Sequence, residues 1–150
     1  YFGDYKVFSA EEKLYEKIDN VEYNFKGYID LVLQTVDNKY HIIDWKTTSW
    51  GWDSRRRSDP MVTYQLTLYK YYFSKKHNIK LENIETHFAL AKRTATKEQV
   101  EIFRVTSGLR KTENALKLLN KAIYNIKRKK HIKNRLSCNG CEFYKTEYCG

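Results

Sequence analysis

The chain has 150 residues, of which 31% are charged and 41% hydrophobic, and glycine and proline together make up only seven. This composition excludes a disordered, collagen-like or low-complexity chain and is typical of one folded domain. The net charge of +10 is uneven, because residues 107–150 hold 11 basic and three acidic side chains. Such a basic tail favours either a polyanionic partner such as nucleic acid or a lysine-rich surface with no specific partner.

The sequence also limits the compartment. No apolar run approaches the roughly 20 residues of a membrane span, so no membrane partner is expected. The first residues do not resemble a signal peptide, and three cysteines, an odd number, argue against a secreted disulfide framework. We therefore expect a cytoplasmic protein. The excess of lysine over arginine hints at a bacterial or viral origin, and the lack of an initial methionine predicts that an N-terminal segment is missing.

In chain order, the first expected element is a helix over residues 9–19, capped by Ser9. Residues 25–36 and 40–48 then read as two strands joined by a turn at Asp37 and Asn38. Both strands are apolar on both faces, which is typical of the centre of a sheet that is covered on each side.

The second half continues with a polar loop over residues 49–59 and a helix over residues 61–76, which starts at Asp59 and Pro60. Two strands follow, at residues 84–92 and 99–105, and then a long helix to about residue 130. The stripe expected to be buried on that helix consists of Leu109, Leu116, Leu119, Ile123 and Ile126. This order predicts a single α/β domain with a central mixed β-sheet flanked by helices, followed by a cysteine-containing segment at residues 131–150.

Three charged residues are unusual in their predicted strands: Asp30 in the first, and Asp44 and Lys46 in the second. Burying an unpaired ion costs several kcal/mol, so charged residues are rare in strands of this kind and their presence requires an explanation. Asp44 and Lys46 are two residues apart and therefore share a face of the strand. A structural ion pair would explain these two charges but not the presence of Asp30. Two carboxylates with one ammonium describe instead a divalent-cation site with a basic neighbour.

At these residues the sequence resembles a known family. Gly-Tyr-Ile-Asp ending at Asp30, with 13 residues before the Asp-Trp-Lys-Thr that begins at Asp44, is similar to the PD-(D/E)XK nuclease superfamily in its RecB-like branch. Gln65 and Tyr69 match the Gln-x-x-x-Tyr pattern of that branch. Glu11 resembles the acid on the helix before the hairpin. Many members also carry a histidine on a helix further upstream, which has no counterpart here.

The resemblance implies a restriction-endonuclease-like core that hydrolyses phosphodiester bonds with Mg²⁺ or Mn²⁺. Asp30, Asp44, the main-chain carbonyl of Trp45 and Glu11 would hold the metal. Glu12 competes with Glu11 for the last position, and an exposed helix face is the plain alternative for both. Lys46 would orient or deprotonate the attacking water, or stabilise charge on the phosphate.

Gln65 and Tyr69 are four apart on the expected helix and so share a face. In the resemblance they point at the site, where they contact the substrate backbone or orient Lys46. The alternative is that Tyr69 packs in the core and Gln65 is merely exposed.

Cys138, Cys141 and Cys149 have the spacing of metal ligands. They resemble the C-terminal cysteines of iron–sulfur members of the RecB-like branch, which implies a 4Fe–4S cluster whose fourth ligand lies outside this chain. We expect their sulfurs to converge. A Zn²⁺ site completed by His131 and ordinary reduced thiols are the two alternatives.

Two basic segments are candidates for contacting phosphates. Arg55, Arg56 and Arg57 follow the strand with Lys46, and Trp50 and Trp52 in the same loop are able to stack on bases; the alternative is a disordered loop with one tryptophan packed down. Residues 127–130 include Lys127 and Arg128, which suit phosphates or the negative end of a helix.

These observations predict a metal-dependent deoxyribonuclease, with a RecB-like exonuclease acting on single strands or duplex ends as the first choice. A helicase or another recombination or replication protein is the expected partner. Two alternatives remain: an inactive nuclease-like module that binds DNA or serves as a scaffold, and a small basic zinc-binding protein whose hairpin charges are structural.

The register of the hairpin tests the site. If opposed residue numbers summed to 75, Asp30 and Asp44 would face opposite sides of the sheet. We therefore predict an even sum of 76, with a three-residue loop over residues 37–39 and either Asn38 or Lys39 in a left-handed conformation, or else a bulge near Asp30.

Overall fold

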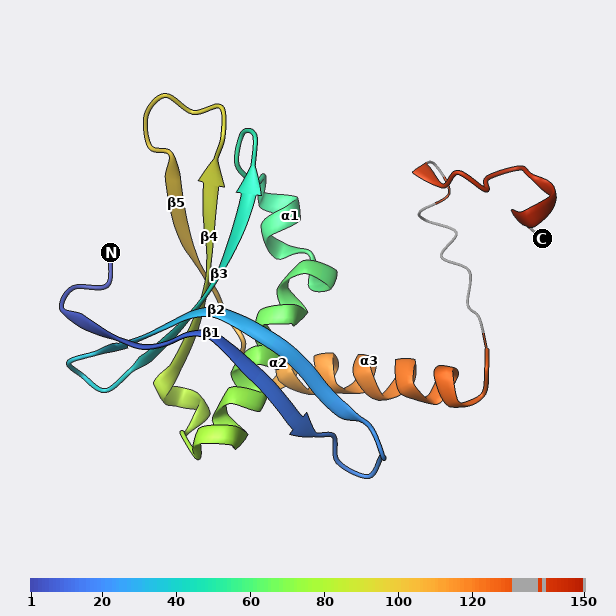
Figure 1. The fold of residues 1–150 in the computed structure, drawn as a ribbon, viewed down its shortest axis with the longest axis horizontal. Helices are drawn as coiled ribbons and strands as arrows, with labels where there is room; N and C mark the ends of the chain where they lie inside the picture. The colour runs from blue at the N-terminus through green and yellow to red at the C-terminus, as the bar shows by residue number, and fades with distance from the viewer. Residues whose placement is uncertain (131–137, 139, 150) are drawn as a thin grey trace. The chain divides into compact units, whose positions relative to one another are not determined.

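Five strands of the computed structural model form one mixed sheet in the order β1-β2-β3-β4-β5 (Figure 1). The structure describes residues 1–130, 138 and 140–149. The parallel pair is β3 with β4, and the other three neighbouring pairs are antiparallel. The predicted α/β class with a central mixed sheet is confirmed. The strands are β1 (Tyr5–Lys17), β2 (Asn24–Thr35), β3 (Tyr40–Thr48), β4 (Ile84–Lys92) and β5 (Val100–Val105).

The helix α2 (Pro60–His77) connects β3 to β4 and lies across one face of the sheet, where it contacts the first four strands (Figure 1). It begins as predicted, because Asp59 Oδ1 accepts the Met61 N–H at 2.8 Å and Pro60 occupies the first turn. It ends at Asn78, whose φ of 53° is left-handed. This helix carries Gln65 and Tyr69 toward the sheet.

Apolar side chains cover both faces of the central strands, as predicted. On one face Leu33, Ile43 and Ala89 form a buried cluster, against which Phe2 from the N-terminal segment packs. On α2, Leu66 and Phe73 are fully buried. Packing on both faces holds β3 rigidly at the centre of the sheet.

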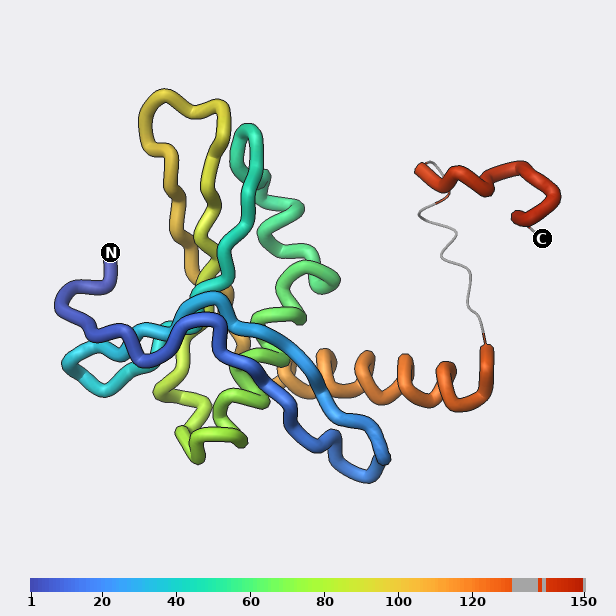
Figure 2. Tube along the Cα trace, viewed as in Figure 1, coloured from blue at the N-terminus to red at the C-terminus, as the bar shows by residue number. Residues whose placement is uncertain are grey.

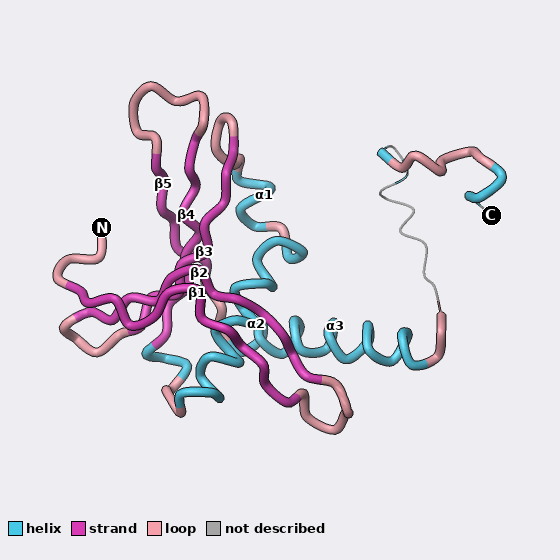
Figure 3. Tube along the Cα trace, in the orientation of Figure 1, coloured by secondary structure: helices cyan, strands magenta, loops and turns pink. Residues whose placement is uncertain are grey.

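The helix predicted over residues 9–19 is wrong: these residues belong mostly to β1, which pairs with β2 along nearly its whole length (Figure 3). The helical reading rested on Leu14 and Ile18, which are four apart. In the strand, Glu12 and Leu14 are the buried pair, two apart. Good local helix formers are overridden here because a long neighbouring strand offers both hydrogen bonds and burial.

The β2–β3 hairpin has an even register, as predicted, but its opposed residues sum to 74 rather than 76, as in Gln34 with Tyr40. The loop is therefore one residue earlier than expected: Thr35 bonds Lys39, and residues 36–38 form the turn. Asn38 has a φ of 60°, which confirms the predicted left-handed residue. The shift places Asp44, rather than Lys46, opposite Asp30.

Two further elements differ from expectation. The polar loop after β3 contains a short helix, α1 (Ser54–Ser58), whose N-terminus is capped by Asp53 (Figure 3). The last helix, α3, is Leu109–Lys127, and the two ends of its predicted buried stripe, Leu109 and Ile126, are exposed, whereas Ile123 is buried.

The chain divides into two compact units, Tyr1–Leu116 and Lys117–Gly150. In the second unit the described residues around the cysteines form successive tight turns, in which Cys141 N–H bonds the Cys138 carbonyl and Cys149 N–H bonds the Thr146 carbonyl. Among the described residues, short 3-10 helices include Leu81–Asn83 in the first unit and Glu147–Cys149 in the second. Within the described ranges, none of the helices combines the length and the apolar character needed to cross a membrane.

Candidate active site

The two strand carboxylates meet where β2 and β3 separate. The β2–β3 pairs end at Leu31 with Ile43, and the next pair in this register is Asp30 with Asp44. Instead of main-chain pairing, Asp30 Oδ2 accepts the Trp45 N–H at 2.7 Å. Thus a carboxylate replaces the neighbouring strand as the partner of β3, and this brings Asp30 beside Asp44.

Asp44 is almost completely buried, with 2% of its surface exposed. Burial raises the pKa of its carboxyl group above the usual 3.8; the Lys46 ammonium opposes this rise and the negative charge of Asp30 adds to it. Lys46 Nζ lies 2.6 Å from Asp44 Oδ2. The predicted Asp44–Lys46 pair exists, and the additional repulsion from Asp30 is the feature that a simple structural ion pair does not account for.

Gln65 and Tyr69 complete a chain of contacts from α2 to Asp44. Gln65 Nε2 donates to Asp44 Oδ1 at 3.0 Å and also contacts Tyr69 Oη at 3.1 Å. Tyr69 is buried and lies so close to Gly27 that a Cβ there would be 2.7 Å from its ring. The helix face expected to carry Gln65 and Tyr69 toward the strands does so, and Tyr69 is a core residue at the same time.

The candidate third acid lies on a strand, which corrects the predicted helix. Glu11 is exposed in β1, with a φ of 47°, and falls between residues paired with Leu31 and Ile29, hence opposite Asp30. Glu12 is buried and pairs with Lys76 and His77. Of the two, only Glu11 is without these structural partners.

These residues suit a divalent cation. Asp44 Oδ2 is buried, and among the described residues no donor reaches it in good hydrogen-bond geometry, although the Lys46 ammonium is close. Asp30 and Asp44 with Lys46 leave one net negative charge, which attracts a cation. Carboxylate oxygens at the edge of a separating strand pair are the ligands that Mg²⁺ and Mn²⁺ prefer.

The arginine-rich segment is partly structural. Arg57 bonds Glu101 at 2.5 Å and the Trp52 carbonyl at 2.8 Å, and Arg56 lies over the buried Trp52 ring. Arg55 is exposed, and so is 84% of Trp50. The arginines therefore lie on an ordered helix. Arg55 on this helix and Trp50 in the loop before it are exposed and so able to reach a ligand.

A basic aromatic surface on β1 and β2 is absent from our sequence predictions. The strands β1 and β2 continue together as a ribbon beyond their pairing with the rest of the sheet (Figure 2). Lys13 pairs with Tyr28 and Tyr15 with Lys26, so all four side chains lie on one face of this ribbon. Both tyrosines are at least half exposed, and each has a lysine ammonium near its ring. The Lys-x-Tyr spacing on both strands was the available signal, but the helix prediction concealed it.

The second unit holds the remaining candidates. Lys127 and Arg128 are exposed, and Arg128 stacks on Tyr124. Cys138 and Cys149 are half-buried and Cys141 is exposed. Among the described residues the three sulfurs do not form a group of ligand atoms within 4.8 Å, so their convergence stays a prediction. His131, the alternative zinc ligand, lies outside the described residues.

Comparison with known proteins agrees with the geometry. The sequence model of one family, described as the PD-(D/E)XK nuclease superfamily, matches residues 4–149. The five-stranded mixed sheet with its helices is consistent with a restriction-endonuclease-like core. No curated protein matches the chain.

A solved structure described as the crystal structure of SSO0001 has a similar fold, with a TM-score of 0.55 and 16% sequence identity. The similarity covers 90% of this chain and 57% of that one, so the chain spans a little more than half of that protein's length. At this identity the likeness concerns the fold alone.

Proposed function

We propose that this chain, which belongs to the PD-(D/E)XK nuclease superfamily, hydrolyses phosphodiester bonds of DNA at Asp30, Asp44 and Lys46 with Mg²⁺ or Mn²⁺. The observation that carries the proposal is the opposition of Asp30 and Asp44 at the point where β2 and β3 separate, with Lys46 Nζ 2.6 Å from Asp44. Members of a nuclease superfamily act on nucleic acids with divalent metals, and this site has the charges for that chemistry.

In this proposal Asp30, Asp44, the Trp45 carbonyl and Glu11 hold the cation. When bound, the cation supplies a more acidic water and neutralises charge on the phosphate. Gln65 donates a hydrogen bond to Asp44 Oδ1, so the other oxygen, Oδ2, faces Lys46.

Lys46 places its ammonium 2.6 Å from Asp44 and one-third exposed, where it is able both to orient a water and to stabilise a phosphate oxygen. Tyr69 fixes Gln65, which in turn fixes Asp44, so the two α2 residues position the carboxylate rather than react themselves.

Single-stranded DNA is the substrate that the surface favours. The Lys13, Tyr15, Lys26 and Tyr28 face lies on the strands that carry Glu11 and Asp30, and exposed tyrosines alternating with lysines suit stacked bases and their phosphates. Trp50 and Arg55 after β3 offer the same pair of contacts. We therefore propose a RecB-like exonuclease that tracks one strand, alongside a helicase or another recombination partner.

The cysteines extend the proposal. Cys138, Cys141 and Cys149 would bind three corners of a 4Fe–4S cluster, with the fourth ligand outside this chain. Their ligand spacing in the sequence supports this. Iron and sulfide analysis after anaerobic purification tests it, and a protein with neither, in which Cys141→Ser changes no property, would contradict it.

The decisive test is a cleavage assay on end-labelled linear and circular single-stranded DNA, with Mg²⁺, Mn²⁺ or a chelator. Asp44→Asn and Lys46→Ala should each lower the cleavage rate at least about 100-fold, because they remove a metal ligand or a stabilising charge, while DNA binding persists.

The matched controls are Asp37→Asn and Lys39→Ala, an exposed acid and base of the same hairpin, which should cleave normally. Near-normal rates for Asp44→Asn would overturn the site. A wild-type protein that binds DNA but never cleaves it would favour the scaffold alternative. Cleavage of circles would replace the exonuclease with an endonuclease.

A further inference from the structure

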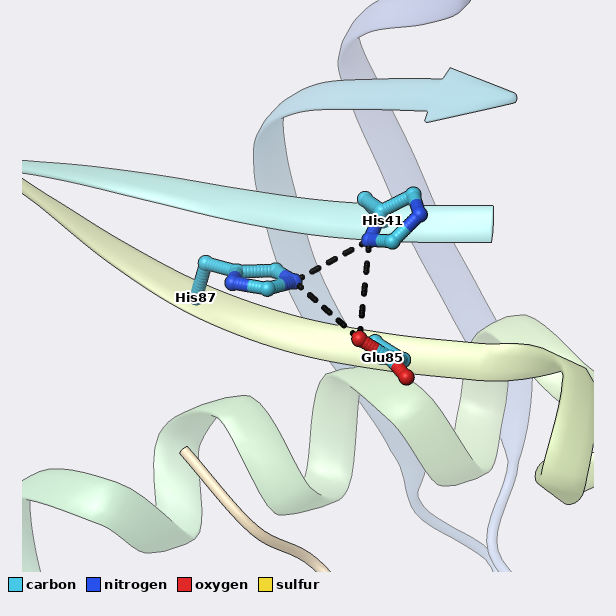
Figure 4. Close-up of side chains that lie close together, drawn as sticks. All are labelled: His41, Glu85 and His87. Carbon is cyan, nitrogen blue, oxygen red and sulfur yellow. Dashed lines mark hydrogen bonds and ion pairs between the residues drawn. The ribbon is translucent and has the colours of Figure 1, made fainter. Parts of the chain in front are cut away.

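A second cluster of potential ligands lies at the opposite end of β3 from Lys46. His41 of β3 and Glu85 and His87 of β4 point toward one another (Figure 4). His41 Nδ1 is 3.1 Å from His87 Nε2, and each of these nitrogens is 3.8 Å from Glu85 Oε2. One potential ligand atom from each of these three side chains lies within 4.8 Å of the other two, and no other such group occurs among the described residues.

The separations match a coordination sphere. Zinc bound to nitrogen and carboxylate oxygen at about 2.0–2.1 Å in a tetrahedron requires ligand atoms roughly 3.3–3.4 Å apart. The observed 3.1 and 3.8 Å lie on either side of that value, so small side-chain adjustments suffice. A set of two imidazoles and one carboxylate selects zinc over magnesium, because magnesium prefers oxygen ligands alone.

The atoms that would not bind metal already have partners. His41 Nε2 is 3.4 Å from Thr35 Oγ1, His87 Nδ1 is 3.5 Å from the Tyr1 hydroxyl, and the second oxygen of Glu85 pairs with Arg104 at 3.3 Å. Metal-ligating histidines are usually oriented by such a partner on the other ring nitrogen. The arrangement therefore fixes each ligand in the direction that a shared cation needs.

Burial affects the charge of both imidazoles. Burial lowers the pKa of His41, and burial together with the neighbouring His41 lowers the pKa of His87 to about 4. Burial therefore disfavours the charged form of both rings, and a metal binds the uncharged form. In the absence of metal one ring donates its N–H to the other across the 3.1 Å contact, so metal binding requires that proton to move to the other nitrogen of the same ring.

The cluster faces open space on one side. A cavity of about 480 Å³ is lined by all three ligands together with the N-terminal segment and the β2–β3 turn, including Phe2 and Asp37. Its volume exceeds what a water molecule in a fourth coordination position needs. The cavity therefore leaves room for a water molecule as the fourth ligand of a zinc ion.

The cluster is separate from the nuclease site. His41 and Asp44 are an odd number of residues apart on β3 and so point to opposite faces of the sheet. The face of His41 and Ile43 is the one that Phe2 covers, whereas Asp44 contacts Gln65 of α2.

We propose that His41, Glu85 and His87 bind one Zn²⁺ ion that links β3 to β4 beneath the N-terminal segment, independently of the metal at Asp30 and Asp44. The ion stabilises the pairing of β4 with β3, the strand that carries Asp44 and Lys46 toward its other end. Its fourth position is a solvent water facing the cavity.

The test uses the full chain with Cys138, Cys141 and Cys149 changed to serine, so that the thiols bind no zinc. Calorimetric titration with Zn²⁺ in excess Mg²⁺ should show one equivalent bound, Co²⁺ should give the visible absorption of a four-coordinate site, and Zn²⁺ should raise the melting temperature. Glu85→Gln and His41→Gln should each weaken zinc binding at least tenfold and abolish the melting shift.

The matched control is Glu82→Gln, an exposed acid just before β4, and Asp44→Asn should likewise keep the zinc equivalent. If the cysteine-free chain binds no stoichiometric zinc, or if Glu85→Gln binds it as tightly as the parent, the proposal is overturned. Glu85→Gln keeps the shape of the side chain and an acceptor for Arg104, so a variant that folds, judged by circular dichroism, remains available even if His41→Gln does not fold.

Discussion

Asp44 is buried beside one cation and one anion, an arrangement that costs stability unless another positive charge joins it. Removing a carboxylate from water costs several kcal/mol. The Lys46 ammonium offsets only part of that cost, and the negative charge of Asp30 adds to it. A divalent cation bound between the two carboxylates would attract both, and this attraction would outweigh the repulsion between Asp30 and Asp44. At the scale of single residues, this balance of charges supports the metal site that we propose.

Gly27 makes the position of Tyr69 possible. A Cβ at Gly27 would lie 2.7 Å from Tyr69 Cε1 and 3.3 Å from Phe25, so Gly27→Ala forces the ring away and with it the hydroxyl that holds Gln65. We expect a loss of about 1–3 kcal/mol in the free energy of unfolding and a slower cleavage rate. Denaturant titration and the cleavage assay measure both. Gly108→Ala, where a Cβ meets nothing within 4 Å, is the control, and equal behaviour of the two variants would contradict this packing argument.

Glu12 gives the molecule a pH-dependent contribution to stability. Burial by itself raises the pKa of Glu12, but hydrogen bonds from Ser9, His77 and Lys76 outweigh it and leave the pKa below 4.5. Because the folded pKa is depressed, this stabilisation is present above pH 4.5 and is lost as the pH falls through the folded pKa.

We therefore expect Glu12→Gln to lower the free energy of unfolding by about 1–3 kcal/mol at pH 7 and the deficit to shrink below pH 4.5. Unfolding curves at a series of pH values measure this. Glu11→Gln, at the exposed neighbour, should change stability little, and a Glu12→Gln deficit that is the same at every pH would refute the argument.

At the scale of elements, the β1–β2 ribbon has two unlike faces. Its inner face packs on α2, where Phe25 stacks on Tyr72 at 4.2 Å and Leu14 is fully buried. Its outer face exposes Tyr15 and Tyr28 between lysines. Because α2 packs against the inner face, the outer face is already ordered. Binding of DNA to it would therefore cost the protein little conformational entropy.

The double variant Tyr15→Ser and Tyr28→Ser should weaken binding of single-stranded oligonucleotides by about 1–3 kcal/mol per lost stacking contact, without unfolding the ribbon. Fluorescence anisotropy in the presence of a chelator measures it. Tyr5→Ser, an exposed tyrosine at the other end of β1, is the control. Unchanged affinity of the double variant would remove the ribbon from the substrate path.

At the scale of the whole molecule, charge separates the chain into a nearly neutral body and a basic end. Residues 107–150 carry 11 basic against three acidic side chains, which yields most of the net charge of +10. Phosphate contacts made by such a segment release counterions, so DNA binding should weaken steeply as salt rises.

Lys127→Ala with Arg128→Ala should lower DNA affinity for all sequences and reduce the slope of log affinity against log salt by about two, one for each lost phosphate contact. Affinity measured over a salt series gives the slope. Lys80→Ala, which removes an exposed lysine near a glutamate, should leave the slope unchanged. An unaltered slope in the double variant would show that the end of α3 does not contact phosphates.

The sequence by itself determined the fold class, the hairpin, the start of α2 and the residues of the candidate site. These are local properties: apolar strand runs, a capping Asp59 before Pro60, and charges in strands where charges are costly. The membership of the nuclease superfamily agrees with the motif formed by Asp30, Asp44 and Lys46. A pattern of residue types at short spacing was enough for each.

Only the tertiary structure decided what depends on distant partners. Residues 9–17 became a strand because β2 offered hydrogen bonds and burial to Glu12 and Leu14, which no helical periodicity in the sequence reveals. The register that opposes Asp30 and Asp44 depends on a turn that begins one residue early. His41, Glu85 and His87 came together because β3 and β4 are parallel neighbours joined by α2, a pairing between residues more than 40 positions apart that is set by packing rather than by local sequence.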